Sequence, residues 1–219
     1  MRYPISIRGV SPMIKGIDVS AWQGNIDFNQ VKADGIKFAI IKAGGSDSGF
    51  YMDKWYLQNV VKAKSSGVDI GAYYIVGSKC KSSADGLADA MRFEEMLGKY
   101  PATFTYPVYI DFEIPNATNK QGNTDAVYSF CEYMEKAGYY AGIYASDISG
   151  FKDRLYLDQL KRFDKWVARY GSEPKYAKPY GIWQSSSKGN ISGINGHVDL
   201  DYSLNDYPTI IKSHHLNGF

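Results

Sequence analysis

The sequence predicts an α/β fold, an irregular single (β/α) barrel that is TIM-like but has fewer helices than strands in its C-terminal half. A length of 219 residues fits one domain of this kind. Short apolar or alternating runs recur along the chain, and stretches with helical spacing separate the early ones. This alternation implies parallel strands joined by right-handed crossovers, and eight such strands close a barrel.

Eight runs, most of them bounded by Gly, Asp or Asn, are expected to form the strands. They are Met13–Ser20, Phe38–Gly44, Asp69–Gly77, Tyr106–Glu113, Tyr139–Ser146, Lys165–Tyr170, Tyr180–Ser186 and Val198–Leu204. The last two connections are too short for a packed helix, because a parallel crossover takes about a dozen residues or more. The second half of the barrel is therefore expected to be irregular and partly without helices.

Four helices are expected between the early strands, at Phe28–Asp34, Asp53–Ser66, Ser82–Tyr100 and Asn123–Ala137. Three of these helices end just before a glycine. The helix at Ser82–Tyr100 begins with a Ser N-cap candidate and is followed by a proline. The ends of these elements divide the chain into an N-terminal extension (1–12), the barrel domain with the catalytic candidates (13–207) and a polar, mobile C-terminal tail (208–219).

Charge and cysteine content exclude several classes of function. Lys plus Arg number 25 and Asp plus Glu 23, so a net charge of +2 gives no case for binding to nucleic acid or a membrane surface. No apolar run approaches the roughly 20 residues that cross a bilayer. Cys80 and Cys131, with only three histidines in the chain, make a poor zinc set. We expect a monomer without metal or cofactor.

The strand Tyr106–Glu113 carries the clearest candidate chemistry. Alternation places Asp111 and Glu113 on the same face as Tyr109, and the apolar residues between them on the face beneath the helices. Barrel active sites lie at the C-terminal ends of the strands, so both carboxylates are expected in the barrel mouth. Two carboxylates this close raise one pKa, which provides a protonated general acid near neutral pH. Two solvated acids, or partners of lysines, would give the same pattern.

Further acids lie in the first and last predicted strands. Asp18 ends the first strand, and Asp199 and Asp201 lie in the last. The first and last strands of a closed barrel are neighbours, so Asp18 and Asp199 are expected to meet across the seam. A turn or N-cap role is the alternative for Asp18.

Five segments in order resemble the signature segments of glycoside hydrolase family 25, the N-acetylmuramidase type of lysozyme. They are Gly16–Ser20, Tyr109–Glu113, Trp166–Tyr170, Ile182–Ser185 and Gly196–Asp201. The resemblance extends from about residue 13 to residue 202. The fold that it implies is an irregular β/α barrel with fewer helices than strands.

The resemblance implies hydrolysis of the β-1,4 bond between N-acetylmuramic acid and N-acetylglucosamine in the glycan strands of bacterial peptidoglycan. Glu113 would be the general acid and then the base for water, and Asp111 would stabilise attack by the substrate's acetamido group, with net retention. Asp18 and Asp199 would complete the acidic rim. Asp18 as the nucleophile is the older alternative.

Aromatic residues near the predicted strand ends could stack on sugar rings, or could serve only as core. The sugar-binding candidates are Trp22, Tyr73, Tyr109, Tyr144, Tyr170 and Trp183, with Gln184 as a hydrogen-bonding residue. The chain departs from the family pattern at Tyr74, where His is common, and in the loop after the second strand, where Thr-Glu-Gly is common. Both departures bear on substrate contacts.

Two other functions share some of these features. A non-catalytic wall-binding module needs the aromatic residues but not the acids, and a chitinase-like N-acetylglucosaminidase normally has a longer Asp-x-x-Asp-x-Asp-x-Glu pattern. Residues 1–12 contain no apolar stretch of signal-peptide type. For an enzyme that acts on the cell wall, we therefore expect holin-dependent release of a phage endolysin, or a signal outside this sequence for a bacterial enzyme.

Overall fold

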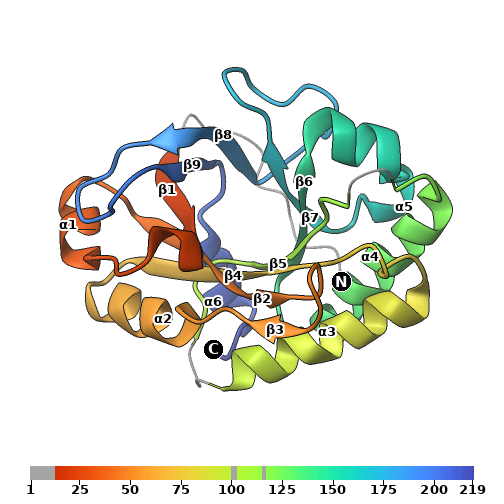
Figure 1. Ribbon diagram of the computed structural model, residues 1–219, viewed down its shortest axis with the longest axis horizontal. Helices are drawn as coiled ribbons and strands as arrows, with labels where there is room; N and C mark the ends of the chain where they lie inside the picture. The colour runs from red at the N-terminus through yellow and green to blue at the C-terminus, as the bar shows by residue number, and fades with distance from the viewer. Residues whose placement is uncertain (1–12, 100–102, 115–116) are drawn as a thin grey trace.

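The computed structural model describes residues 13–99, 103–114 and 117–219, and in these residues eight strands close a barrel (Figure 1). Around the barrel the order is β1-β9-β8-β7-β6-β5-β4-β2, and β2 pairs with β1 to close it. The strands are β1 (Ile14–Val19), β2 (Phe38–Gly45), β4 (Asp69–Ile75), β5 (Val108–Asp111), β6 (Ala141–Ser146), β7 (Asp164–Ala168), β8 (Ile182–Gly189) and β9 (Val198–Ser203). A short strand β3 (Tyr51–Met52) forms a hairpin with β2 and was not expected from the sequence.

The expectation of parallel strands throughout is wrong for the last strand. β9 is antiparallel to both β8 and β1, whereas the six other pairings in the barrel are parallel. The connection between β8 and β9 is too short for a crossover but long enough for a hairpin loop, so the chain turns back. The short connection between the last two predicted strands was therefore the sequence feature that indicates an antiparallel β9.

Helices accompany the first half of the barrel, as the spacing predicts. They are α1 (Phe28–Ala33), α2 (Tyr56–Ser65), α3 (Ser83–Gly98) and α4 (Lys120–Lys136). Two further helices were not expected from the sequence: α5 (Leu157–Leu160) precedes β7, and α6 (Tyr207–Ser213) follows β9. In Figure 1, α2 and α3 lie along the lower part of the view and α1 lies at its left, while β8 and β9 lie toward the top next to loops. α4 starts before the predicted Asn123, because the side chain of Asn119 accepts a hydrogen bond from Gly122 N and caps it.

Two hydrophobic layers confirm the predicted alternation in β5. Val108, Ile110 and Phe112 belong to the layer between the sheet and the helices, while Tyr109 belongs to the barrel interior. The interior is filled largely by rings, among them Phe38, Tyr73, Tyr106, Tyr144, Trp166 and Tyr207. Large rings require small neighbours, and a Cβ atom at Gly16 would lie 2.3 Å from the ring of Phe38.

The C-terminal residues pack against the barrel instead of forming the mobile tail that the sequence suggests. Tyr207 and Ile211 of α6 belong to the interior layer. The side chain of Asn217 is buried, accepts a hydrogen bond from Tyr140 N at 2.7 Å and donates to the carbonyls of Phe104 and Tyr106. The predicted N-terminal extension lies outside the described residues. Within those residues, no helix has the length and apolar character of a membrane span.

Candidate active site

Four acids lie at one rim of the barrel. Asp18 is on β1, Asp111 ends β5, Glu113 lies two residues further on, and Asp199 is the second residue of β9. Because β9 is antiparallel, its first residues lie level with the last residues of the parallel strands. Asp18 is the direct cross-strand partner of Asp199, so the two acids meet across the seam as expected.

Gln184 on β8 holds the two seam carboxylates together. Its amide nitrogen donates to Asp18 Oδ2 at 2.8 Å and to Asp199 Oδ2 at 3.4 Å. Its amide oxygen accepts hydrogen bonds from the hydroxyls of Tyr144 at 2.8 Å and Tyr170 at 3.2 Å. The four contacts fix which way the amide points, and they join β1, β6, β8 and β9 at the mouth.

Asp111 and Glu113 occupy different environments although they are two residues apart. Asp111 is 4% exposed, and its Oδ1 has no hydrogen-bond partner among the described residues. Burial, followed by the charge of Glu113, holds the pKa of Asp111 well above its usual range, and Lys42 opposes that rise. Glu113 has exposed surface at the mouth. The surrounding protein still removes part of its hydration, which raises its pKa; Asp199 adds to the rise, whereas Tyr144 and Lys42 oppose it.

Sequence reasoning missed Lys42 and assigned no role to Asp201. Lys42 lies on β2 and alternates with Phe38 and Ile40, which face the barrel interior. This spacing of two residues could have predicted that Lys42 also faces the interior. Asp201 is completely buried, two residues beyond Asp199 on the same face of β9. Lys42 brings a positive charge to the acidic rim, and Asp201 brings a further carboxyl group.

Several of the aromatic candidates lie at or near the mouth. Tyr73 and Tyr144 belong to the interior layer and are slightly exposed, and Tyr170 is 55% exposed. Trp22 is 91% exposed on the 3-10 turn η1 (Ala21–Gln23), three residues after the end of β1. These four residues are placed where a ligand in the mouth could reach them.

Tyr109 and Trp183 are not placed in the cleft. Tyr109 has no exposed surface, and its hydroxyl donates to Asp164 Oδ2 at 2.8 Å, at the N-terminal end of β7. Trp183 alternates with Gln184, so its ring faces away from the interior, where it packs on Tyr202 and donates to Arg169 O at 2.7 Å. The alternation of a strand does not allow both Trp183 and Gln184 to reach the mouth.

Tyr74, the departure from the family pattern, also faces the helix layer. Its hydroxyl donates to Asp89 Oδ1 at 3.0 Å, and Ser46 Oγ donates to the other oxygen of the same carboxylate at 3.1 Å. Ser46 follows β2, so this network ties the loop after β2 to α3. Tyr74 therefore points away from the barrel interior and helps to hold the loop after β2.

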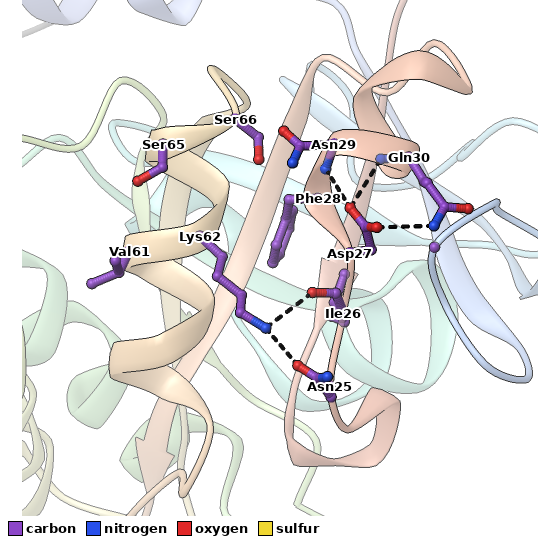
Figure 2. A pocket seen from close by; sticks show the side chains of 11 residues that line it. Asn25, Ile26, Asp27, Phe28, Asn29, Gln30, Val61, Lys62, Ser65 and Ser66 are labelled. Atoms are coloured by element: carbon purple, nitrogen blue, oxygen red, sulfur yellow. Dashed lines mark hydrogen bonds between the residues drawn. The ribbon is translucent and has the colours of Figure 1, made fainter.

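A separate hollow of about 510 Å³ lies between α1 and α2, away from the acids (Figure 2). Its charged groups, Lys62 and Asp27, already form hydrogen bonds with neighbouring residues. Lys62 Nζ donates to Asn25 Oδ1 and to Ile26 O, and Asp27 accepts three hydrogen bonds from Asn29 and Gln30 as the N-cap of α1. The hollow contains no pair of carboxylates, so the candidate chemistry belongs to the barrel mouth.

The mouth brings together Glu113, which has exposed surface, and Asp111, whose Oδ1 has no hydrogen-bond partner among the described residues. Two neighbouring carboxyl groups with raised pKa values are suited to acid-catalysed cleavage of a glycosidic bond. Comparison with known proteins supports this chemistry. The protein-family model described as "Glycosyl hydrolases family 25" matches residues 17–194.

Individual relatives extend the comparison. The autolytic lysozyme of Clostridium acetobutylicum is 29% identical over 189 residues, which cover 86% of this chain and 55% of that protein. This chain thus spans about half the length of that relative. The crystal structure of the CTP1L endolysin has a TM-score of 0.79 at 27% identity and covers 92% of this chain and 70% of its own.

The modular autolysin LytC from Streptococcus pneumoniae, solved in complex with a synthetic peptidoglycan ligand, gives a TM-score of 0.77 at 26% identity. The match covers 89% of this chain and 47% of LytC. Both structures share the barrel architecture described above, and the family match covers most of the chain. The chain therefore belongs to the family 25 glycosyl hydrolases.

Proposed function

We propose that the protein is a lysozyme that hydrolyses peptidoglycan at the β-1,4 bond between N-acetylmuramic acid and N-acetylglucosamine. The pairing of Asp111 with Glu113 at the barrel mouth is the observation that carries this proposal. Membership of family 25 supports it, as do the lysozyme and autolysin among its relatives. The ligand is a glycan strand.

Glu113 acts as the general acid. Its raised pKa keeps it protonated closer to neutral pH than an ordinary glutamate, and its exposed position gives a glycosidic oxygen access to the proton. As the bond from the anomeric carbon to the leaving oxygen breaks, that oxygen takes the proton. Glu113 is then a carboxylate, and it removes a proton from the water that completes hydrolysis.

Asp111 stabilises the intermediate between these two steps. The substrate's acetamido oxygen attacks the anomeric carbon, and the positive charge that develops on the acetamido group needs a nearby acceptor. The unpartnered Oδ1 of Asp111 is suited to accept the acetamido N–H. Attack by the acetamido group and then by water inverts the anomeric carbon twice, which gives net retention.

Asp18 and Asp199 position the substrate with Gln184. Burial, then the charges of Asp201 and Asp199, holds the pKa of Asp18 well above its usual range. A carboxyl group whose charged form is disfavoured by burial, and which also accepts a hydrogen bond from Gln184, is a poor nucleophile. This environment favours the acetamido route over attack by Asp18. Tyr73, Tyr144, Tyr170 and Trp22 provide the remaining contacts to the sugars.

Glu113→Gln tests the proposal, with Glu95→Gln on the exposed face of α3 as the matched control. Clearing of a cell-wall suspension should fall by about a hundredfold or more in Glu113→Gln, since general acid catalysis contributes about 10²–10⁴-fold. Thermal unfolding should be unchanged. Activity near that of the unchanged protein would remove Glu113 from this role.

Mass spectrometry of the digest identifies the bond that is cut. N-acetylmuramic acid at the new reducing end is expected. N-acetylglucosamine there would indicate a chitinase-like specificity, and retention on the wall without new reducing ends would indicate a binding module.

A further inference from the structure

Asp201 is buried directly beneath the acidic rim and has no place in the mechanism above. It has no exposed surface, and its neighbours across β1 and β8 are Gly16 and Gln184. Its Oδ1 accepts a hydrogen bond from the indole Nε1 of Trp166 at 2.8 Å. Its Oδ2 is buried and, among the described residues, no donor reaches it. An acceptor left in this state is costly unless a proton satisfies it.

The neighbour that can supply the proton is Asp18. The two side chains face the interior from adjacent antiparallel strands, where Asp201 pairs with Gly16, two residues before Asp18, and they interact directly. Burial is the largest effect on both groups; it raises the pKa of Asp201 to about 8 and that of Asp18 well above its usual range. Two such groups titrate as a pair that retains one proton.

The surroundings of the pair contain no compensating ion pair. Within residues 13–99, 103–114 and 117–219, no Lys or Arg forms a salt bridge with Asp18, Asp199 or Asp201. Lys42 acts on Asp111 and Glu113. The interior of the mouth presents Asp18 from β1, Lys42 from β2, Tyr73 from β4, Asp111 and Glu113 from β5, Tyr144 from β6 and Asp199 from β9, while β7 and β8 present the non-titrating Trp166 and Gln184.

We propose that Asp201 is a positioning residue that shares one proton with Asp18 and so holds Asp18 against Gln184 in the geometry that the substrate needs. The inference rests on the proposed function for its catalytic consequence only. Trp166 fixes one oxygen of Asp201, the shared proton joins the other oxygen to Asp18, and Gln184 holds Asp18 from the mouth side. When the proton is lost, two adjacent carboxylates repel each other and this arrangement opens.

Asp201→Asn and Asp201→Leu separate a shared proton from simple packing. Asparagine keeps an oxygen for Trp166 and places an N–H where the shared proton lies, whereas leucine has neither. Asp201→Asn should therefore retain at least about tenfold more wall-clearing activity than Asp201→Leu at pH 6. Its rate should also lack the loss of activity near pH 8 that accompanies loss of the shared proton in the unchanged protein.

Asp164→Asn is the matched control. Asp164 is also an interior aspartate with two hydrogen-bond donors, Tyr109 and Tyr207, but it lies at the other end of the barrel. This variant should lose stability without any change in the shape of the activity–pH profile. Equal loss of activity in Asp201→Asn and Asp201→Leu, or an unchanged step near pH 8 in Asp201→Asn, would overturn the proposal.

Infrared spectroscopy tests the proton independently of activity. The unchanged protein should show a protonated-carboxyl C=O band that disappears as the pH rises through about 8, and Asp201→Asn should lack that component. The same band in both proteins would contradict the shared proton even if Asp201→Leu fails to fold. If the unchanged protein releases no reducing ends but shows the band, the proposed function fails while the shared proton stands.

Discussion

Trp22 is a large apolar side chain held in solvent by a rigid turn. Ser20 caps the turn by accepting a hydrogen bond from Trp22 N at 3.2 Å, and Asp53 Oδ2 accepts one from Ala21 N at 2.9 Å. Gln23 adds contacts to Ser20 N and to His197 O, two residues before Asp199. The turn is thus tied to the residues that follow β1 and precede β9, and we propose that its exposed ring stacks on a sugar of the glycan strand.

Trp22→Ala should weaken binding to purified cell walls by about threefold to tenfold, the range expected for one lost stacking contact. The melting temperature should stay the same, because 91% of the side chain is already exposed in the folded protein. Sedimentation with cell walls, using the Glu113→Gln background to prevent digestion, measures the affinity. Met91→Ala on α3, also an exposed apolar side chain, is the control. Unchanged affinity would show that Trp22 lies outside the path of the glycan.

At the scale of elements, hydrophobic alternation and end signals were sufficient to predict the barrel strands and helices α1 to α4. They were insufficient where the outcome depends on the length of a connection or on contacts between residues far apart in the sequence. The direction of β9 depends on a hairpin loop, and the burial of Asn217 depends on three backbone groups far away in the sequence. Neither leaves a periodic pattern in the sequence.

In the candidate site, too, some residues could be placed from the sequence and others could not. Asp18, Asp111 and Glu113 were placed at one rim by strand ends, whereas Asp199 was placed there by the closure of the barrel and reaches it because β9 is antiparallel. Lys42 could have been placed by its alternation with Ile40. Trp183 was misplaced because its own alternation with Gln184 was not applied. The unpartnered oxygen of Asp201 could not be predicted, since it depends on the distances between side chains of three strands.

Asp147 organises the segment that follows β7 and contains Tyr170. It lies in the π-helical turn η2 (Asp147–Lys152) and accepts hydrogen bonds from the backbone N–H groups of residues 175, 176 and 177 and from the guanidinium of Arg169. Burial acts to raise the pKa of Asp147, but these four donors outweigh it and hold that pKa below its ordinary value.

Asp147→Asn should lower the free energy of unfolding by about 2–4 kcal/mol at pH 7, because an amide presents an N–H to donors that need an acceptor. A carboxylate with a depressed pKa stabilises the fold above its ordinary range and loses that contribution as the pH falls through the folded-state value. The stability difference between the two proteins should therefore shrink on acidification below about pH 4. Urea unfolding at several pH values measures it, with Asp153→Asn as the control. A difference that is independent of pH would contradict this account.

For the molecule as a whole, the candidate active site and the residues that close the barrel lie at opposite ends of the barrel. The acids, Gln184 and the exposed aromatics lie at the C-terminal ends of the parallel strands, as in other β/α barrels. The other end is closed by α6 and the residues after it, which place Tyr207 and Leu216 in the interior layer. Changes at the closed end should therefore alter stability without altering the catalytic step.

Asn217 provides the test of that separation. Its side chain makes three buried hydrogen bonds to the backbone before β5 and before β6, and its own backbone has a φ of 54°, a conformation that asparagine tolerates better than alanine. Asn217→Ala leaves those backbone groups without partners and adds strain, so the free energy of unfolding should fall by about 2–5 kcal/mol. Ser213→Ala, an exposed residue at the end of α6, should change it little. Urea unfolding measures the loss. The wall-clearing rate per folded molecule at 25 °C should equal that of the unchanged protein, and a lower rate would mean that closure of the far end does control the geometry of the mouth.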